Sequence, residues 1–173
     1  MAVRPILVLD DPRLRIKAKK IKRVDGSIQR IIDDMIDTMR DAPGAGLAAT
    51  QIGVPLRIIV ARAPKDEDDP LSGRLIVLCN PEILRWEGEE EAEEGCLSVP
   101  GYVGDVKRAA LVLVQGKNRA DKVVRFEAQG WLARIFQHEI DHLNGMVYVD
   151  RLASPSELRK LPPEEESGEA DGL

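Results

Sequence analysis

Apolar residues recur at helical spacing between residues 27 and 44, and this pattern predicts an amphipathic helix. The apolar positions are Ile28, Ile31, Ile32, Met35, Ile36 and Met39. Asp25 or Ser27 is suited to cap the start of this helix, and the sequence APG ends it. One face of the helix is therefore expected to pack against a core.

A second helix is predicted over residues 131–145, in the sequence WLARIFQHEIDHLNG. Its end is clear, because Asn144 and Gly145 favour a left-handed C-terminal cap. Its start carries only weak signals, Glu127 and Gly130. We therefore expect a helix with a well-defined end and an ill-defined beginning.

Runs of apolar and β-branched residues predict strands between and after these helices. They lie at 56–63, at 74–86 with an edge or break at Pro81, twice within 109–130 around a polar turn, and briefly at 146–152. Glycine-rich 44–55 is predicted to be a loop or tight turn and charged 64–73 a loop, whereas acidic 87–95 is predicted to be partly solvated. Helices interleaved unevenly with hairpin-like strands favour an α+β fold, with mostly antiparallel or mixed sheets packed around the second helix.

Composition and charge narrow the class of protein. A chain of 173 residues with 43% hydrophobic and 32% charged residues is typical of one soluble globular domain. The net charge of −5 argues against a general nucleic-acid binder. No apolar run has the length of a membrane span, and the N-terminal sequence lacks the features of a signal peptide, so we expect a cytoplasmic protein. Residues 1–152 are expected to form the folded domain, and 153–173, rich in Pro and Glu, an acidic, frayed tail.

The two histidines carry the clearest chemical signal. His138 and His142 are four residues apart on the second predicted helix, so both imidazoles can point at one ion. Glu139 is turned away from that direction but can reach a water bound to the ion, as in H-E-x-x-H metal hydrolases. Chance would give this arrangement on the order of once in a thousand.

A catalytic metal centre needs a third protein ligand and an open position. The chain has no third histidine, and downstream carboxylates such as Asp150 do not lie on an obvious second helix. Cys96 is the remaining candidate, since Gly95 before it allows close backbone approach. A Cys-His-His set would suit iron(II), zinc, cobalt or nickel. The other cysteine, Cys79, lies in an apolar segment and is expected to be buried.

Three segments together resemble a known family. GAGLAATQ (44–51), EGCLS (94–98) and QHEIDH (137–142) are similar, in this order, to the three signature segments of the peptide deformylases, and the resemblance covers residues 1 to about 152. Those enzymes remove the formyl group from the initiator methionine of newly made bacterial or organellar proteins. The resemblance implies one divalent ion, iron(II) in the cell and replaceable by zinc, nickel or cobalt.

The resemblance also implies roles for single residues. Cys96, His138 and His142 would bind the metal, and Glu139 would act as acid and base. The side chain of Gln51 and the backbone N–H of Leu97 would stabilise the oxyanion. The implied partners are N-formylmethionyl nascent peptides, with transient proximity to the ribosome, and no direct binding to nucleic acid or membrane is expected.

Candidate substrate contacts follow from residue size and helical spacing. The small residues around Gly46 leave room for a peptide backbone, and Gly95 allows a similar approach. Trp131 and Ile135 precede His138 by seven and three residues, which places them on the same side of the helix. We expect them to line an apolar pocket for the methionine side chain, although simple core packing is the alternative.

Nearby polar residues carry structural expectations. Asp141 is expected to pair with a basic residue such as Arg108 or with solvent. Gln137 is expected to be a buried amide that orients local backbone. The stem of Arg134 is expected to pack while its head reaches solvent.

Three other functions remain open from the residues alone. A metallopeptidase that cuts internal peptide bonds would share the H-E-x-x-H motif. A cysteine hydrolase would use Cys96 as nucleophile and a histidine as base. A closed, non-catalytic metal site would use Cys79 as a fourth ligand.

Overall fold

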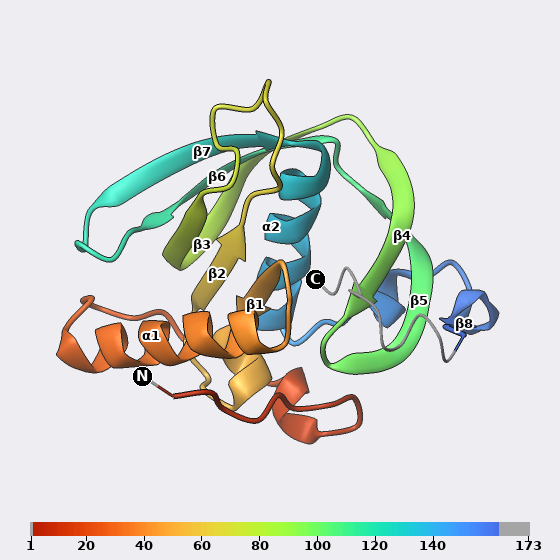
Figure 1. Cartoon of the computed structure of the whole chain (residues 1–173), viewed down its shortest axis with the longest axis horizontal. Coiled ribbons are helices and arrows are strands. Elements are labelled where there is room, and N and C mark those ends of the chain that lie inside the picture. The colour runs from red at the N-terminus through yellow and green to blue at the C-terminus, as the bar shows by residue number, and fades with distance from the viewer. Residues whose placement is uncertain (1, 163–173) are drawn as a thin grey trace.

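The computed structural model describes residues 2–162 and shows two helices with two antiparallel sheets (Figure 1). The helices are α1 (Gly26–Asp41) and α2 (Gly130–Leu143). The larger sheet has the order β1-β2-β3-β6-β7 and the smaller one β4-β5-β8. The strands are β1 (Gly46–Ala48), β2 (Ile58–Arg62), β3 (Leu75–Glu87), β4 (Glu90–Cys96), β5 (Val99–Arg108), β6 (Leu111–Lys117), β7 (Val123–Gln129) and β8 (Arg159–Lys160). The predicted α+β class is confirmed.

The five-stranded sheet has a helix on each face. On β2, Ile59 belongs to the core cluster shared with α2, whereas Ile58 and Val60 belong to the cluster shared with α1. Successive side chains of a strand point to opposite faces, so this alternation explains why β2 is apolar almost throughout. In Figure 1, α2 runs between the larger sheet and the β4–β5 hairpin. The helix is thus central, as predicted, and buried on nearly every side.

Both predicted helices are confirmed, with their ends close to the expected positions. Asp25 caps α1, since its carboxylate accepts a hydrogen bond from the backbone N–H of Ile28 at 3.1 Å. At the end of α2, Asn144 is the C-cap and Gly145 has a φ of 76°. A Cβ on Gly145 would lie 2.5 Å from the carbonyl oxygen of Arg15, so this position requires glycine on two grounds.

The predicted strands at 56–63, 74–86 and within 109–130 are confirmed as β2, β3, β6 and β7. The expected break at Pro81 is present, because the pairing of β3 with β6 shifts register between Cys79 and Glu82. One predicted loop is wrong, because segment 44–55 contains β1 and a 3-10 helix, Ala49–Ile52. The partial solvation expected for 87–95 is confirmed, since residues 87–91 and 93 are exposed, and the segment contains most of β4. The three residues of β1 are too few to show alternation, and β4 is ordered by its pairing with β5, which includes the buried ion pair of Glu94 with Arg108.

Two predictions near the C-terminal end are also wrong. The strand expected at 146–152 is a 3-10 helix, Tyr148–Arg151, in which the carboxylate of Asp150 accepts from the N–H of Val147 at 3.0 Å. This local side-chain bond competes with strand pairing. The segment from Ser154 was expected to be frayed, but it is ordered up to Lys160, where β8 pairs with β5. Residues 163–173 of the predicted tail lie outside the described residues, and the domain division at residue 152 stays a prediction.

Candidate active site

The fold brings together side chains from three separate elements. His138, Glu139 and His142 lie on α2, Cys96 ends β4 at its tight turn into β5, and Gln51 belongs to the 3-10 helix that follows β1. All five side chains are buried. The predicted ligands and acid-base residue therefore meet in one place in the interior, between α2 and the β4–β5 hairpin.

Cys96, His138 and His142 form a group whose ligand atoms all lie within 4.8 Å of one another. The thiol sulfur of Cys96 is 3.3 Å from Nε2 of His142. Nε2 of His138 is buried and has no hydrogen-bond partner in residues 2–162. Although burial lowers the pKa of His138, the interactions with Cys96, Glu139 and Glu94 together outweigh it and raise the pKa to about 10, so the site favours positive charge. Sulfur and two imidazole nitrogens are a donor set that fits a divalent transition-metal ion.

Glu139 lies beside this group with its carboxylate free to react. The side chain is fully buried, and neither oxygen has a hydrogen-bond partner in the part of the chain that the structure describes. Burial raises the pKa of Glu139 to about 7. A carboxyl group with a pKa near neutrality can both take up and release a proton at physiological pH.

Hydrogen bonds fix the amide of Gln51. Its Oε1 accepts from the backbone N–H of Ala48 at 2.9 Å. Its Nε2 donates to Oγ of Ser98 at 3.0 Å and faces the sulfur of Cys96 at 3.6 Å. The orientation leaves the amide N–H₂ turned toward the cysteine turn, where the backbone N–H of Leu97 also lies.

A buried ion network orients His138. Glu94 accepts from Nδ1 of His138 at 2.8 Å, which leaves Nε2 of that ring on the side of Cys96. Arg108 donates to both oxygens of Glu94 at 2.9 Å, and Arg134 donates to Oε2 at 2.6 Å. Burial raises the pKa of Glu94, but the bonds from Arg108 and His138 outweigh it and hold the pKa well below its usual value. Glu94 is therefore an anion that supports the imidazole from behind.

The network confirms two structural predictions and corrects a third. Asp141 pairs with Arg108 at 2.6 Å, as expected. The amide of Gln137 bonds the backbone N–H and the carbonyl oxygen of Ala109, both at 3.0 Å, also as expected. The prediction for Arg134 is wrong, because its guanidinium is buried with Glu94 rather than exposed to solvent.

Some candidate residues lie outside the cluster. Ile135 is fully buried in the core between α2 and the larger sheet, and Trp131 packs against the same core cluster. Their role in a methionine pocket stays a prediction. Cys79 is buried in the other core cluster, where burial raises its pKa to about 11. It does not belong to the ligand group that residues 2–162 provide, which argues against a closed site with Cys79 as fourth ligand.

Two functional neighbours were missed from the sequence. Glu94 was noted only as the first residue of a motif, and nothing local shows that two arginines and a histidine converge on it. Tyr148 stacks on His138 with 6.2 Å between ring centroids, and its buried hydroxyl has no hydrogen-bond partner among the residues described. Its position after the Gly145 turn carries no sequence signal.

No helix among residues 2–162 is long and apolar enough to cross a membrane.

Comparisons with known proteins agree with this geometry. The family model described as polypeptide deformylase matches residues 3–157. A peptide deformylase of Dehalococcoides mccartyi strain BAV1 is 46% identical over 98% of both chains. The crystal structure of a peptide deformylase from Ehrlichia chaffeensis is 37% identical, with a TM-score of 0.84 over 90% of this chain and 91% of that one. A class I type b peptide deformylase from Acinetobacter baumannii, solved with Met-Ala-Ser bound, is 33% identical, with a TM-score of 0.81 over 87% and 99% of the chains.

Proposed function

This chain belongs to the polypeptide deformylase family, the metal-dependent hydrolases that remove the formyl group from an N-terminal methionine, and we propose that it does so with one divalent ion held by Cys96, His138 and His142. The observation that carries the proposal is the convergence of these three ligands within 4.8 Å beside a carboxylate that has no hydrogen-bond partner in residues 2–162. A bound divalent ion lowers the pKa of water toward neutrality and polarises a carbonyl group.

Glu139 is the proposed acid and base. Its carboxylate takes the proton of the attacking water and later delivers it to the leaving amine, so formate and the free amino terminus are the products. A pKa of about 7 suits both transfers. Such proton transfers supply roughly 10²–10⁴ in rate.

Gln51 and Leu97 are the proposed donors to the oxyanion that develops on the formyl oxygen. The amide of Gln51 is held from behind by Ala48 and keeps its bond to Ser98, and the N–H that faces the Cys96 sulfur at 3.6 Å would turn to the oxyanion. The backbone N–H of Leu97 belongs to the turn after Cys96 and is therefore close to the same point. Loss of one donor of this kind costs roughly 10²–10³ in rate.

Iron(II) is the proposed ion in the cell, and zinc, nickel or cobalt would also be accepted. Thiolate and imidazole ligands suit all four ions, and the iron(II) proposal rests on the family resemblance. The buried, unpartnered Nε2 of His138 supports an ion at this point.

The proposed substrate is an N-formylmethionyl nascent peptide in an extended conformation. Strand β1 supports this, because it is the edge of the larger sheet and, among residues 2–162, pairs only with β2. An extended peptide can add to such an edge. Gly46 and Gly95 would lie against its backbone, with Trp131 and Ile135 as the wall of the methionine pocket. The Met-Ala-Ser complex of the relative from Acinetobacter baumannii supports a peptide of this kind.

The proposed setting is the cytoplasm, with transient proximity to the ribosome during synthesis of the substrate. The net charge of −5 supports the proposal that the chain makes no direct contact with nucleic acid or membrane. The proposed catalytic domain is residues 1–152, followed by the acidic segment 153–173.

One experiment separates this proposal from its rivals. Protein purified without oxygen is analysed for metals and assayed with formyl-Met-Ala-Ser and with a blocked internal peptide, before and after chelation. We expect one divalent ion per chain, release of formate, no internal cleavage, and loss of activity on chelation. The 3.3 Å contact between Cys96 and His142 would also suit a cysteine hydrolase, which predicts full activity after chelation and would refute the metal mechanism.

A further inference from the structure

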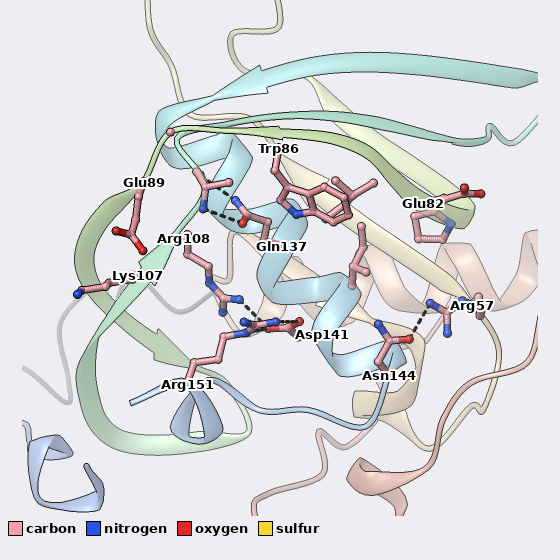
Figure 2. Close-up of a pocket in the computed structure, with 15 residues that line it drawn as sticks. Arg57, Glu82, Trp86, Glu89, Lys107, Arg108, Gln137, Asp141, Asn144 and Arg151 are labelled. Atoms are coloured by element: carbon pink, nitrogen blue, oxygen red, sulfur yellow. Dashed lines mark hydrogen bonds and ion pairs between the residues drawn. The ribbon is translucent and has the colours of Figure 1, made fainter. Parts of the chain in front are cut away.

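A cavity lies on the opposite side of α2 from the proposed catalytic residues (Figure 2). The helix contributes Gln137, Ile140, Asp141 and Asn144 to its wall, whereas His138 and His142 point to the other side. Its volume is about 500 Å³, which falls in the range of about 300–1,000 Å³ found for small-molecule sites. The cavity belongs to neither the metal ligands nor Glu139.

One wall of this cavity is apolar. Pro81, Ile83 and Trp86 of β3 line it, together with Ile140 of α2. Trp86 is 60% exposed, an unusual degree for so large an apolar side chain, and the indole lies over the cavity in Figure 2. Strand β3 pairs with β2 only as far as Cys79, so its later residues leave one edge open beside the cavity. A ligand with an apolar body would cover the indole and this wall.

The facing wall is rich in hydrogen-bond donors and positive charge. Arg57 and Arg151 lie along it, with Asn144 between them (Figure 2). Arg57 donates only to neutral oxygens, at 3.0 Å to Oδ1 of Asn144 and 3.1 Å to the carbonyl of Leu143, and pairs with no carboxylate of residues 2–162. It therefore keeps an uncompensated charge facing the cavity.

The carboxylates around the cavity leave Arg57 as the arginine of this wall without an ion pair in residues 2–162. Asp141 is shared between Arg108, at 2.6 Å, and Arg151, at 2.5 and 2.7 Å, and the two bonds from Arg151 come from Nε and Nη2, so its Nη1 stays available to a ligand. Glu82 and Glu89 are exposed at the rim, and the Glu82 carboxylate points outward in Figure 2. Lys107 adds an exposed ammonium at the rim without an ion pair in the described part of the chain.

We propose that this cavity is a binding site for a small organic monocarboxylate with an apolar body. The carboxylate lies against Arg57 and Arg151, which offer charge-assisted hydrogen bonds, and the body covers Trp86 and Ile83. The site is separate from the metal centre, so the proposal stands whether or not the proposed catalytic mechanism is correct.

Trp86 serves as the reporter, because the chain has only one other tryptophan, Trp131. The metal-loaded, full-length Trp131→Phe variant is titrated at constant ionic strength with hexanoate, and with hexanamide, which has the same tail without the charge. We expect a saturable change in Trp86 emission with hexanoate, and a dissociation constant at least tenfold higher for hexanamide. Equal responses to the two compounds would overturn the proposal.

Substitutions locate the charge contact. Arg57→Gln and Arg151→Gln should each raise the dissociation constant for hexanoate about tenfold, the loss of one charge-assisted hydrogen bond. Arg125→Gln is the matched control, because Arg125 is an exposed arginine on β7 that bonds Gln115. It should leave hexanoate binding unchanged. Unchanged binding in both cavity variants would refute the assignment.

A measurement without cavity variants covers the case in which these substitutions disturb folding. Backbone chemical shifts are recorded for the wild-type chain, loaded with zinc, as hexanoate is added. We expect the largest changes at Ile83, Trp86 and Ile140. Changes centred on Cys96 and Leu97 would place the carboxylate at the metal centre and would overturn the proposal.

Discussion

The carboxylate of Glu139 packs directly against Gly46, because a Cβ atom on this glycine would lie 2.5 Å from Oε2 of Glu139. Any larger side chain at position 46 would take the space that the carboxylate occupies. The sequence had suggested that Gly46 leaves room for a substrate backbone. The structure adds a second reason for glycine, on the side of β1 that faces α2. The strand that is proposed to receive the substrate and the residue proposed to move its proton are thus in direct contact.

Gly46→Ala should separate catalysis from metal binding. The added methyl group must displace Glu139, and a shift of about 1 Å at a catalytic group can cost roughly 10²-fold in rate. We expect kcat/KM on formyl-Met-Ala-Ser to fall by about two orders of magnitude, with metal content unchanged. Gly26→Ala is the control, since its Cβ would meet only Arg30, at 3.8 Å, and should keep full activity. A Gly46→Ala enzyme within threefold of wild type would contradict this contact.

Glu139→Ala should keep the metal and lose nearly all turnover. The carboxylate is not in the ligand group, and its removal takes away the proton acceptor, worth roughly 10²–10⁴ in rate. Elemental analysis and a formate-release assay on the same preparation measure the two properties. Glu139→Gln, which keeps the size of the side chain, should behave in the same way. A variant that deformylates at a normal rate would rule out this residue as the base.

Activity should fall at acid pH with a single titration. Glu139 accepts a proton only when ionised, and burial raises its pKa from 4.5 to about 7. A nearby cation favours the ionised form and lowers the pKa again, so we expect the midpoint of log kcat/KM to lie between these two values. Below the midpoint the rate should drop tenfold per pH unit. A profile that stays flat from pH 8 to pH 4.5 would exclude Glu139 as the titrating base.

The two cysteines should respond differently to the same substitution. Cys96→Ser removes a thiolate ligand, so the metal content should fall from about one ion per chain to near zero. Cys79→Ser places a hydroxyl in an apolar core and should lower the free energy of unfolding by about 1–3 kcal/mol without loss of metal. Loss of metal from the Cys79 variant would instead support a closed, non-catalytic metal site with Cys79 as the fourth ligand.

Glu94→Gln should destabilise the fold in a pH-dependent way. The substitution leaves the buried guanidinium of Arg134 without its anion and leaves Arg108 with Asp141 alone, at a cost of about 3–5 kcal/mol at pH 7. The folded-state pKa of Glu94 is depressed, so its contribution is complete above the unfolded pKa, near 4.5, and is lost as pH falls through the folded value. The difference from wild type should therefore narrow below pH 4.5.

The neighbouring residue provides the control for Glu94. Glu93→Gln removes an exposed carboxylate that pairs with Arg159 at 2.8 Å, and should cost less than about 1 kcal/mol at any pH. Urea unfolding at several pH values measures both variants. A Glu94 variant as stable as the Glu93 variant at pH 7 would show that the buried network does not support the fold.

Local periodicity was enough to predict the helices and four of the strands. The helical pattern of α1 and the apolar runs of β2 and β3 are properties of neighbouring residues. Strands β1 and β8 have three and two residues, too few to show alternation, and they are ordered by partners far away in the sequence. Acidic β4 is ordered by its pairing with β5 and by the ion pair of Glu94 with Arg108, which no local pattern reveals.

The residues that are proposed as metal ligands could be singled out for a related reason. His138 and His142 are one helical turn apart, so their convergence is local, and Cys96 followed by elimination in a chain with two histidines and two cysteines. The supporting anion was not predictable, because Glu94 meets Arg108 and His138 across separations of 14 and 44 residues. The expectation for Arg134 failed for the same reason, since only the tertiary fold supplies its buried partner.

The convergence of Cys96 with the two histidines of α2 also bears on the stability of the fold. The two contacting residues, Cys96 and His142, are 46 positions apart and belong to different layers, so an ion between them would act as a cross-link from the β4–β5 hairpin to α2. An unfolded chain does not hold the three ligands together, and binding energy at the site then becomes folding energy. Lack of the ion would therefore lower the stability of the fold and shorten the lifetime of the protein, in addition to removing its activity.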